Sequence, residues 1–262
     1  MNKKREIVAL ALLPLIYLYI MKLPAVFFLG LLFFISAGAQ MEFYSMYRVK
    51  KSLSFLGIFS GLLFLYSVYI GWGEVRLLLI ISFLFLVLFR LFDRKAGPEQ
   101  ALSDIAPVVV GFSYIPLILS LQIALRDAGP EWIIFIGATV WASDSFAYYI
   151  GKNFGKRKLY PSISPKKTIE GAVGSMTGGV LAGVLIKILL IDSITVYQVL
   201  VVGFIIGCIA VLGDLTESMF KRDSGVKDSS SLIPGHGGVL DKIDGMLFVT
   251  PVVYLVVKYV VS

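Results

Sequence analysis

Residues 218–244 hold the densest set of reactive side chains in the chain. These 27 residues include four Lys or Arg, four Asp, four Gly and the only histidine, His236. Apolar runs of about membrane-spanning length lie on both sides. A charged segment between two membrane helices is either a surface connector or a reaction site, and the rest of the sequence favours a reaction site.

Six carboxylates are expected at one depth, where four consecutive apolar segments approach the same side of a membrane: Asp144, Glu170, Asp214, Glu217, Asp241 and Asp244. Ionisable side chains in membrane helices are costly and by default mark a functional site. Several carboxylates can share a low-dielectric pocket only if cations offset their repulsion. Oxygen ligands without cysteines or clustered histidines favour Mg²⁺, expected on Asp144, Asp214, Asp241 and Asp244. The alternative is simple pairing with nearby Lys and Arg at helix ends.

Two further motifs could meet a phosphate. In Ser164-Pro-Lys-Lys-Thr168, the threonine is placed to cap the following helix while Lys166 and Lys167 meet an anion. Alternatively, these lysines only hold the loop in the cytoplasm and contact anionic lipid. In Pro234-Gly-His-Gly-Gly238, the glycines let backbone N–H groups approach phosphate oxygens, and His236 could bind phosphate or donate a proton.

The composition indicates an all-α polytopic membrane protein, since 58% of the 262 residues are hydrophobic. Only 16% are charged, whereas soluble domains average about 25%. The only cysteine, Cys208, lies in an apolar run, so the chain cannot form an internal disulfide. About nine transmembrane helices are predicted, at residues 7–21, 24–40, 53–71, 75–92, 105–125, 131–150, 170–190, 195–213 and 245–261.

The distribution of Lys and Arg predicts a cytoplasmic N-terminus. With this orientation, 19 basic residues lie inside and four outside. The loops 151–169 and 214–244 then both face the cytoplasm, and the net charge of +7 requires no nucleic acid. We expect an N-terminal region of about four spans at 1–100 and a catalytic region at 101–262.

The pattern of residues 144–244 resembles the phosphatidate cytidylyltransferases, the CDP-diacylglycerol synthases. The resemblance rests on Ser218-x-x-Lys221-Arg222, on Lys227-Asp228, and on His236-Gly-Gly-x-x-Asp241-x-x-Asp244. Asp144-x-x-Ala147-Tyr148 and Ser164-Pro-Lys-Lys-Thr168-x-Glu170-Gly171 also match. One position departs from the family pattern, because Lys242 stands where the family usually has Arg, and the two are not interchangeable at a bidentate phosphate contact.

The resemblance implies transfer of the cytidylyl group of CTP to phosphatidic acid, with Mg²⁺ and room for a second cation. The implied catalytic residues are Asp214, Lys221, Arg222, Lys227, Asp228, His236, Asp241 and Asp244. The implied substrate-binding residues are Lys166, Lys167, Thr168, Ser218, Gly235, Gly237, Gly238 and Lys242. The expected setting is the lipid bilayer of the cytoplasmic (inner) membrane, with the site facing the cytoplasm and a homodimer as a further expectation.

Two alternatives remain at this stage. The first is CTP-dependent transfer to an ether-linked, archaeal-type lipid phosphate. The second is a cation- or proton-coupled transporter in which acids such as Asp144 carry the ion. A transporter favours inverted repeats and interrupted helices at the midplane, and neither is evident in the sequence.

Overall fold

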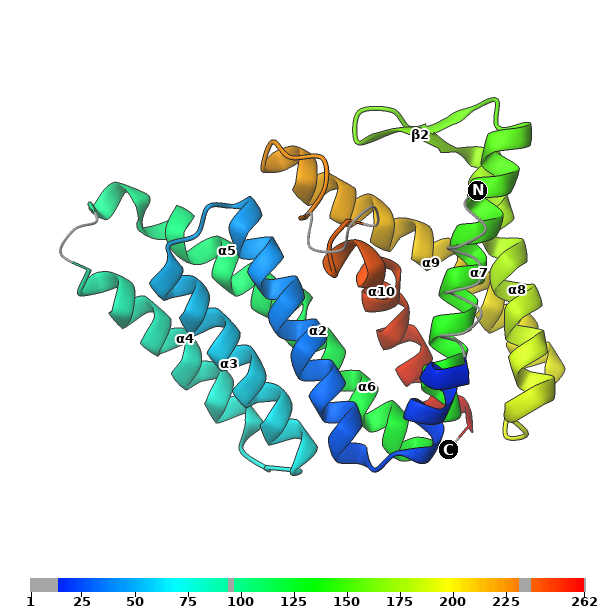
Figure 1. Cartoon of the computed structure of the whole chain (residues 1–262), viewed down its shortest axis with the longest axis horizontal. Coiled ribbons are helices and arrows are strands. Elements are labelled where there is room, and N and C mark those ends of the chain that lie inside the picture. Colours follow the sequence, from blue (N-terminus) through cyan, green and yellow to red (C-terminus); the bar gives the residue numbers. More distant parts are fainter. Residues whose placement is uncertain (1–13, 94–96, 231–236, 262) are drawn as a thin grey trace.

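The computed structural model describes residues 14–93, 97–230 and 237–261. Residues 14–22 are helical, and a long bundle with one β-hairpin follows (Figure 1). The elements are α2 (Ala25–Met46), α3 (Lys51–Tyr69), α4 (Val75–Leu91), η1 (Pro98–Gln100), α5 (Ala101–Tyr114), α6 (Pro116–Ala128), α7 (Glu131–Phe154), β1 (Lys158–Tyr160), β2 (Ser164–Thr168), α8 (Ile169–Leu190), α9 (Val196–Asp223), α10 (Leu240–Val256) and the π-helical η2 (Val257–Val261).

The predicted all-α polytopic membrane architecture is confirmed. Within the described residues, seven helical stretches are long and apolar enough to cross a membrane. Of the nine predicted spans, the first extends outside the described residues, and the fourth corresponds to α4, which has only 17 residues. The predicted span 105–125 is divided between α5 and α6 at Ile115, because Pro116 opens α6 and has no backbone N–H to continue the helix.

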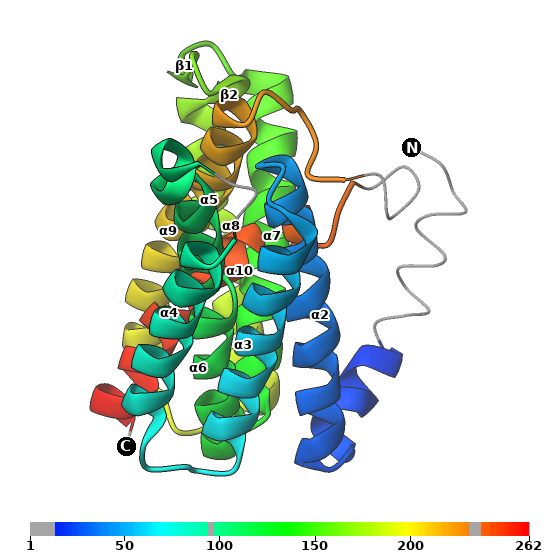
Figure 2. The ribbon, with the colours of Figure 1, turned by 90° about the vertical axis from the view of Figure 1, so that its left-hand side faces the viewer.

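The helices alternate in direction, so the ends of α2, α4, α7 and α9 lie together at the end of the bundle that carries the hairpin (Figures 1 and 2). This hairpin end is where the sequence analysis places the basic, cytoplasmic connections. The starts of α3, α8 and α10 lie there too, whereas the C-terminus lies at the opposite end. The arrangement agrees with the predicted alternation, while the orientation in a membrane stays a prediction.

The two segments predicted as loops are more ordered than expected. In 151–169, β1 and β2 pair antiparallel, with Lys158 opposite Thr168 and Tyr160 opposite Ser164. In 214–244, α9 continues to Asp223 and α10 already begins at Leu240. The acids of this segment therefore lie on helices, which limits the positions that their carboxylates can reach.

Glycines bring α7, α8 and α9 into backbone contact. A Cβ at Gly178 of α8 would lie 2.6 Å from the carbonyl oxygen of Ala142 in α7. On the other side, a Cβ at Gly207 of α9 would lie 2.6 Å from the carbonyl oxygen of Ser175 in α8. The Ser175 hydroxyl donates to the Gly207 carbonyl over 2.9 Å. These glycines therefore serve close helix packing within the chain.

We expect Gly207→Leu to destabilise the bundle, because its side chain must push α8 away from α9 at a cost of about 1–3 kcal/mol or more. Thermal unfolding of the detergent-purified protein measures this effect. Gly30→Ala in α2 is the control, since a Cβ there has open space, and it should stabilise by up to about 1 kcal/mol. Equal melting temperatures for Gly207→Leu and wild type would contradict the packing argument.

Candidate active site

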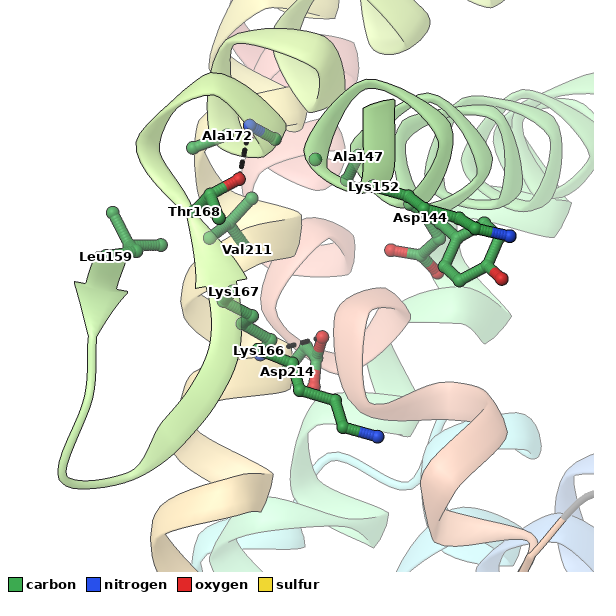
Figure 3. Close-up of a pocket in the computed structure, with 13 residues that line it drawn as sticks. Asp144, Ala147, Lys152, Leu159, Lys166, Lys167, Thr168, Ala172, Val211 and Asp214 are labelled. Atoms are coloured by element: carbon green, nitrogen blue, oxygen red, sulfur yellow. Dashed lines mark hydrogen bonds and ion pairs between the residues drawn. The ribbon is translucent and has the colours of Figure 1, made fainter. Parts of the chain in front are cut away.

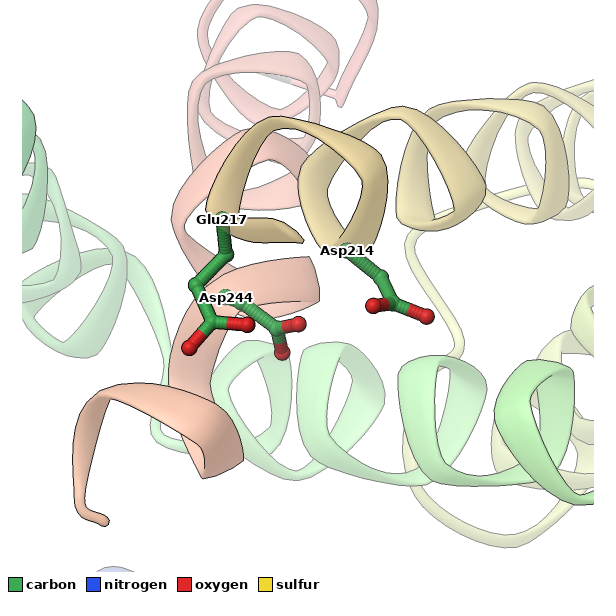
Figure 4. Close-up of side chains that lie close together, drawn as sticks. All are labelled: Asp214, Glu217 and Asp244. Carbon is green, nitrogen blue, oxygen red and sulfur yellow. The ribbon is translucent and has the colours of Figure 1, made fainter. Parts of the chain in front are cut away.

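Three carboxylates converge at the hairpin end between α9 and α10. One oxygen each of Asp214, Glu217 and Asp244 lies within 4.8 Å of the others (Figure 4). Asp214 and Glu217 share one face of α9, as their spacing predicts, and Asp244 faces them from the first turns of α10. Glu217 is only 1% exposed and Asp244 only 9%. We call this group the carboxylate triad.

Gly213 allows α9 and α10 to approach closely enough to form the triad. A Cβ at this position would lie 2.6 Å from the carbonyl oxygen of Asp244 and 3.0 Å from the Cα of Gly245. The Asp244 carboxylate in turn accepts a 2.8 Å hydrogen bond from the N–H of Gly245. A larger residue at 213 would therefore separate the two helices that supply the three carboxylates.

Lys221 joins the triad to Asp241. Its ammonium lies 2.5 Å from Oε2 of Glu217, one turn earlier in α9, and 2.6 Å from Oδ1 of Asp241 in α10. Oδ2 of Asp241 accepts from the N–H of Gly238 over 2.7 Å and from the Ser229 hydroxyl over 2.8 Å. Both oxygens of Asp241 are thus already occupied, which distinguishes it from the triad.

The negative charge of this cluster exceeds its compensation. The triad and Asp241 contribute four carboxylates, and the ion pairs of the described residues bring two lysines to them, Lys167 and Lys221. With all six groups ionised, four minus two leaves two negative charges. Oε1 of Glu217 is buried and has no hydrogen-bond partner among the described residues. Burial without compensation is costly, so the cluster favours a bound cation.

The dimensions of the triad fit a hard divalent cation. Oxygens bound to one such ion lie at most about 4–5 Å apart, which is twice the usual metal–oxygen distance. The 4.8 Å limit on the triad oxygens satisfies this condition. The triad includes two of the four predicted metal ligands, Asp214 and Asp244, and adds Glu217. Asp144 and Asp241 lie outside it.

A basic pocket adjoins the triad. It has a volume of about 400 Å³, and its wall includes Asp144, Lys152, Lys166, Lys167 and Asp214 (Figure 3). The Lys167 ammonium lies 2.7 Å from Oδ2 of Asp214, so the pocket and the triad share this carboxylate. Three lysines around one cavity can neutralise a phosphate, whereas the neighbouring acids suit a cation.

The β-hairpin holds two of these lysines in place. As predicted, Thr168 caps α8, its hydroxyl accepting a 3.1 Å hydrogen bond from the N–H of Gly171. Glu170 in the first turn of α8 accepts from the backbone N–H groups of Lys156 and Arg157 over 3.0 and 3.2 Å. The hairpin is thereby tied at its base to the helix that it precedes, and β2 presents Lys166 and Lys167 to the pocket.

The other predicted residues that the structure describes lie on α9, on α10 or between these helices. The guanidinium of Arg222 bonds the carbonyls of Ile163 and Val226, which links the hairpin to the segment after α9. Ser218 is buried beside Glu217, whereas Lys227, Asp228 and Lys242 are exposed. Gly235 and His236 lie outside the described residues.

Gly237 and Gly238 precede α10, next to Asp241. Gly237 has a φ of +84°, in the left-handed region that favours glycine. A Cβ there would lie 2.5 Å from Oδ2 of Asp241. The two glycines therefore serve the close packing of this carboxylate, and contact with a phosphate stays a prediction for them.

Sequence reasoning missed two residues of this region. Lys152, at the end of α7, lines the pocket although no role was assigned to it. The second is Glu42, in α2, which was missed because the sequence assigns residues 1–100 only to membrane spans. It is 3% exposed, and its carboxylate accepts hydrogen bonds from residues on both sides of 231–236. An acid inside an apolar span was the available signal.

Comparison with known proteins identifies the family. The model of the cytidylyltransferase family matches residues 3–260. The phosphatidate cytidylyltransferase of Thermotoga maritima is 36% identical over 186 residues, 68% of this chain and 68% of the relative. That of Haemophilus influenzae is 43% identical over 190 residues, 70% of this chain and 64% of the relative. That of Bacillus subtilis is 35% identical over 155 residues, 58% of each. The chain belongs to the cytidylyltransferase family.

Proposed function

We propose that this protein transfers the cytidylyl group of CTP to phosphatidic acid, giving CDP-diacylglycerol and pyrophosphate for phospholipid biosynthesis. The observation that carries the proposal is the carboxylate triad beside a pocket with three lysines, at one end of an apolar helical bundle. The substrate follows the printed names of the relatives, all phosphatidate cytidylyltransferases.

The reaction needs little covalent help from the protein. An oxygen of the lipid phosphate attacks the α-phosphorus of CTP, a new P–O bond forms, and the bond from this phosphorus to the bridging oxygen breaks. The electron pair leaves with pyrophosphate. Since the lipid phosphate is already ionised, no strong base is required. The barrier comes from bringing two polyanions together, so positioning and electrostatic stabilisation dominate.

The side chains of this site suit that task. Lys152, Lys166 and Lys167 neutralise phosphate oxygens in the pocket, and Arg222 adds charge where the hairpin meets α9. Lys221, held between two carboxylates, is oriented rather than free to rotate. Roles for Lys227, Asp228, His236 and Lys242 in contacting the pyrophosphate remain predictions from the family pattern.

Mg²⁺ fits the triad better than the four aspartates of the sequence analysis. Asp214, Glu217 and Asp244 would hold it, because they offer close oxygens and one of these lacks a partner among the described residues. When bound, the ion supplies positive charge that offsets phosphate charge. Asp241 instead orients Lys221, and Asp144 contributes negative charge across the pocket. A second cation remains a prediction.

The site is proposed to face the cytoplasm from the inner membrane, with the N-terminus on the same side. The clustering of the basic connections at the hairpin end supports this orientation. There, CTP can arrive from water while the lipid enters sideways. A homodimer remains a prediction, since the glycine faces of α8 and α9 are used within the chain. Family membership disfavours the transporter.

The direct test uses purified, detergent-solubilised protein with labelled CTP, Mg²⁺ and phosphatidic acid. Label in the lipid phase that depends on Mg²⁺ establishes the reaction. If label enters the lipid phase only with an ether-linked lipid phosphate, the substrate differs from the one proposed but the reaction is the same. Folded protein that labels no lipid phosphate rejects the proposed function.

Asp241→Asn and Asp214→Asn should each reduce turnover by about 100-fold while the protein still inserts. The first variant places a neutral amide beside the Lys221 ammonium. The second replaces the triad carboxylate that pairs with Lys167 by a neutral amide. Turnover of purified variants measures the effect. Asp192→Asn, in the exposed connection between α8 and α9, is the matched control and should behave as wild type. Normal activity of both site variants would reject the assignment of these acids.

Glu217→Gln should weaken Mg²⁺ binding, because it removes one charge from the triad but keeps the shape of the side chain. We expect the Mg²⁺ concentration for half-maximal activity to rise by about 10- to 100-fold. A titration of activity with Mg²⁺ at saturating CTP measures it. An unchanged midpoint would show that the ion binds elsewhere.

Lys242→Arg should retain or improve turnover, because it restores the residue usual in the family at an exposed position in the first turn of α10. Steady-state kinetics with CTP provide the measurement. A large loss would instead show that this site is built around the compact ammonium of lysine.

A further inference from the structure

Glu42 is a buried carboxylate whose hydrogen-bond partners, among the residues that the structure describes, come from a distant part of the chain. It lies in α2 and is 3% exposed. Three groups donate to it: the hydroxyl of Ser230 (2.6 Å) and the N–H groups of Val239 (2.9 Å) and Leu240 (2.8 Å). A fourth, the Ser229 hydroxyl, lies 3.2 Å from it and is shared with Asp241. Three donors and a shared fourth on one carboxylate offset much of the cost of burying its charge.

The contacts with Val239 and Leu240 make Glu42 the cap of α10. The first N–H groups of a helix have no partner within it, and their end of the helix carries partial positive charge. The side chain of the N-cap residue, Val239, makes no hydrogen bond to these N–H groups. Glu42 supplies both the acceptor and the negative charge from a different helix. The start of α10, and with it the first turns that carry Asp241 and Asp244, is thereby held against α2.

Ser229 couples Glu42 to the site more directly. Its hydroxyl lies 3.2 Å from Oε2 of Glu42 and 2.8 Å from Oδ2 of Asp241. Because a serine has one hydroxyl proton, it can donate to only one of these carboxylates at a time. Glu42 therefore influences the hydrogen bonding of Asp241, which in turn binds Lys221. The path from α2 to the triad consists of adjacent hydrogen bonds and ion pairs.

We propose that Glu42 is a positioning residue of the cytidylyl-transfer site: it caps α10 from α2 and, through Ser229, orients Asp241 and Lys221. This inference rests on the proposed function. Glu42 is neither among the residues that line the pocket nor part of the triad, so it acts through the groups that are.

Gln40 provides the control that separates positioning from general packing. It lies two residues earlier in α2 and is fully buried. Its amide donates to the Tyr44 hydroxyl over 2.9 Å and to the Gly57 carbonyl of α3 over 3.1 Å, away from α10. Replacing it should disturb the bundle without altering the site.

The experiment compares Glu42→Gln, Ser229→Ala, their double variant and Gln40→Leu, purified in detergent. Kinetics give kcat and KM for CTP, thermal unfolding gives stability, and hydrogen exchange follows the amides of Val239 and Leu240. We expect Glu42→Gln to lower kcat by about 10- to 100-fold and to speed exchange at both amides. The fold-loss in kcat of the double variant should be smaller than the product of the two single fold-losses, because both residues act on Asp241.

Gln40→Leu should lower the melting temperature but keep kcat per folded molecule and the slow exchange of both amides. Wild-type kcat in Glu42→Gln, or equal loss of kcat in Glu42→Gln and Gln40→Leu, would overturn the positioning role. If wild type transfers no cytidylyl group, the proposed function fails separately. The exchange result then decides on Glu42 alone: faster exchange at the two amides supports its hold on α10, and unchanged exchange refutes it.

Discussion

Repulsion among carboxylates at one depth of an apolar bundle is the constraint on which the rest of this structure depends. Lys221 bridges Glu217 and Asp241, and Lys167 pairs with Asp214. The glycines of α7–α10 allow these helices to approach closely. The hairpin, which ends at the Thr168 cap of α8, positions Lys167, and Glu42 accepts hydrogen bonds from the start of α10. Each device keeps a charge opposite its partner, and the remaining negative charge is what a cation and a phosphate-rich substrate can use.

The features predicted correctly from the sequence are the local ones. Apolar runs predicted most helices, because span length and hydropathy are properties of consecutive residues. The spacing of Asp214 and Glu217 predicted a shared face of α9, and Thr168 before an apolar run predicted the cap of α8. The charged signature could be located in the same way, since its residues lie within one segment.

The features missed depend on which helices meet. No spacing rule distinguishes Asp244, which completes the triad, from Asp241, which binds Lys221 and Ser229 instead. Glu42 lies 197 positions before Val239, so its place in an apolar helix could mark it as unusual but could not identify its partners. The division of the predicted span 105–125 at Ile115 was signalled locally by Pro116, but the length of the apolar run concealed it.

The separation between Glu42 and its donors also affects the order in which the protein assembles during synthesis. Glu42 and Leu240 lie 198 positions apart, so α2 enters the membrane long before α10 has been synthesised. Until then the acid lacks the backbone donors of α10, and an uncompensated charge in an apolar interior is costly. Docking of α10 relieves that cost and completes the triad in the same event. A nascent chain therefore completes its carboxylate triad only once α10 is in place, because Asp244 lies on that helix.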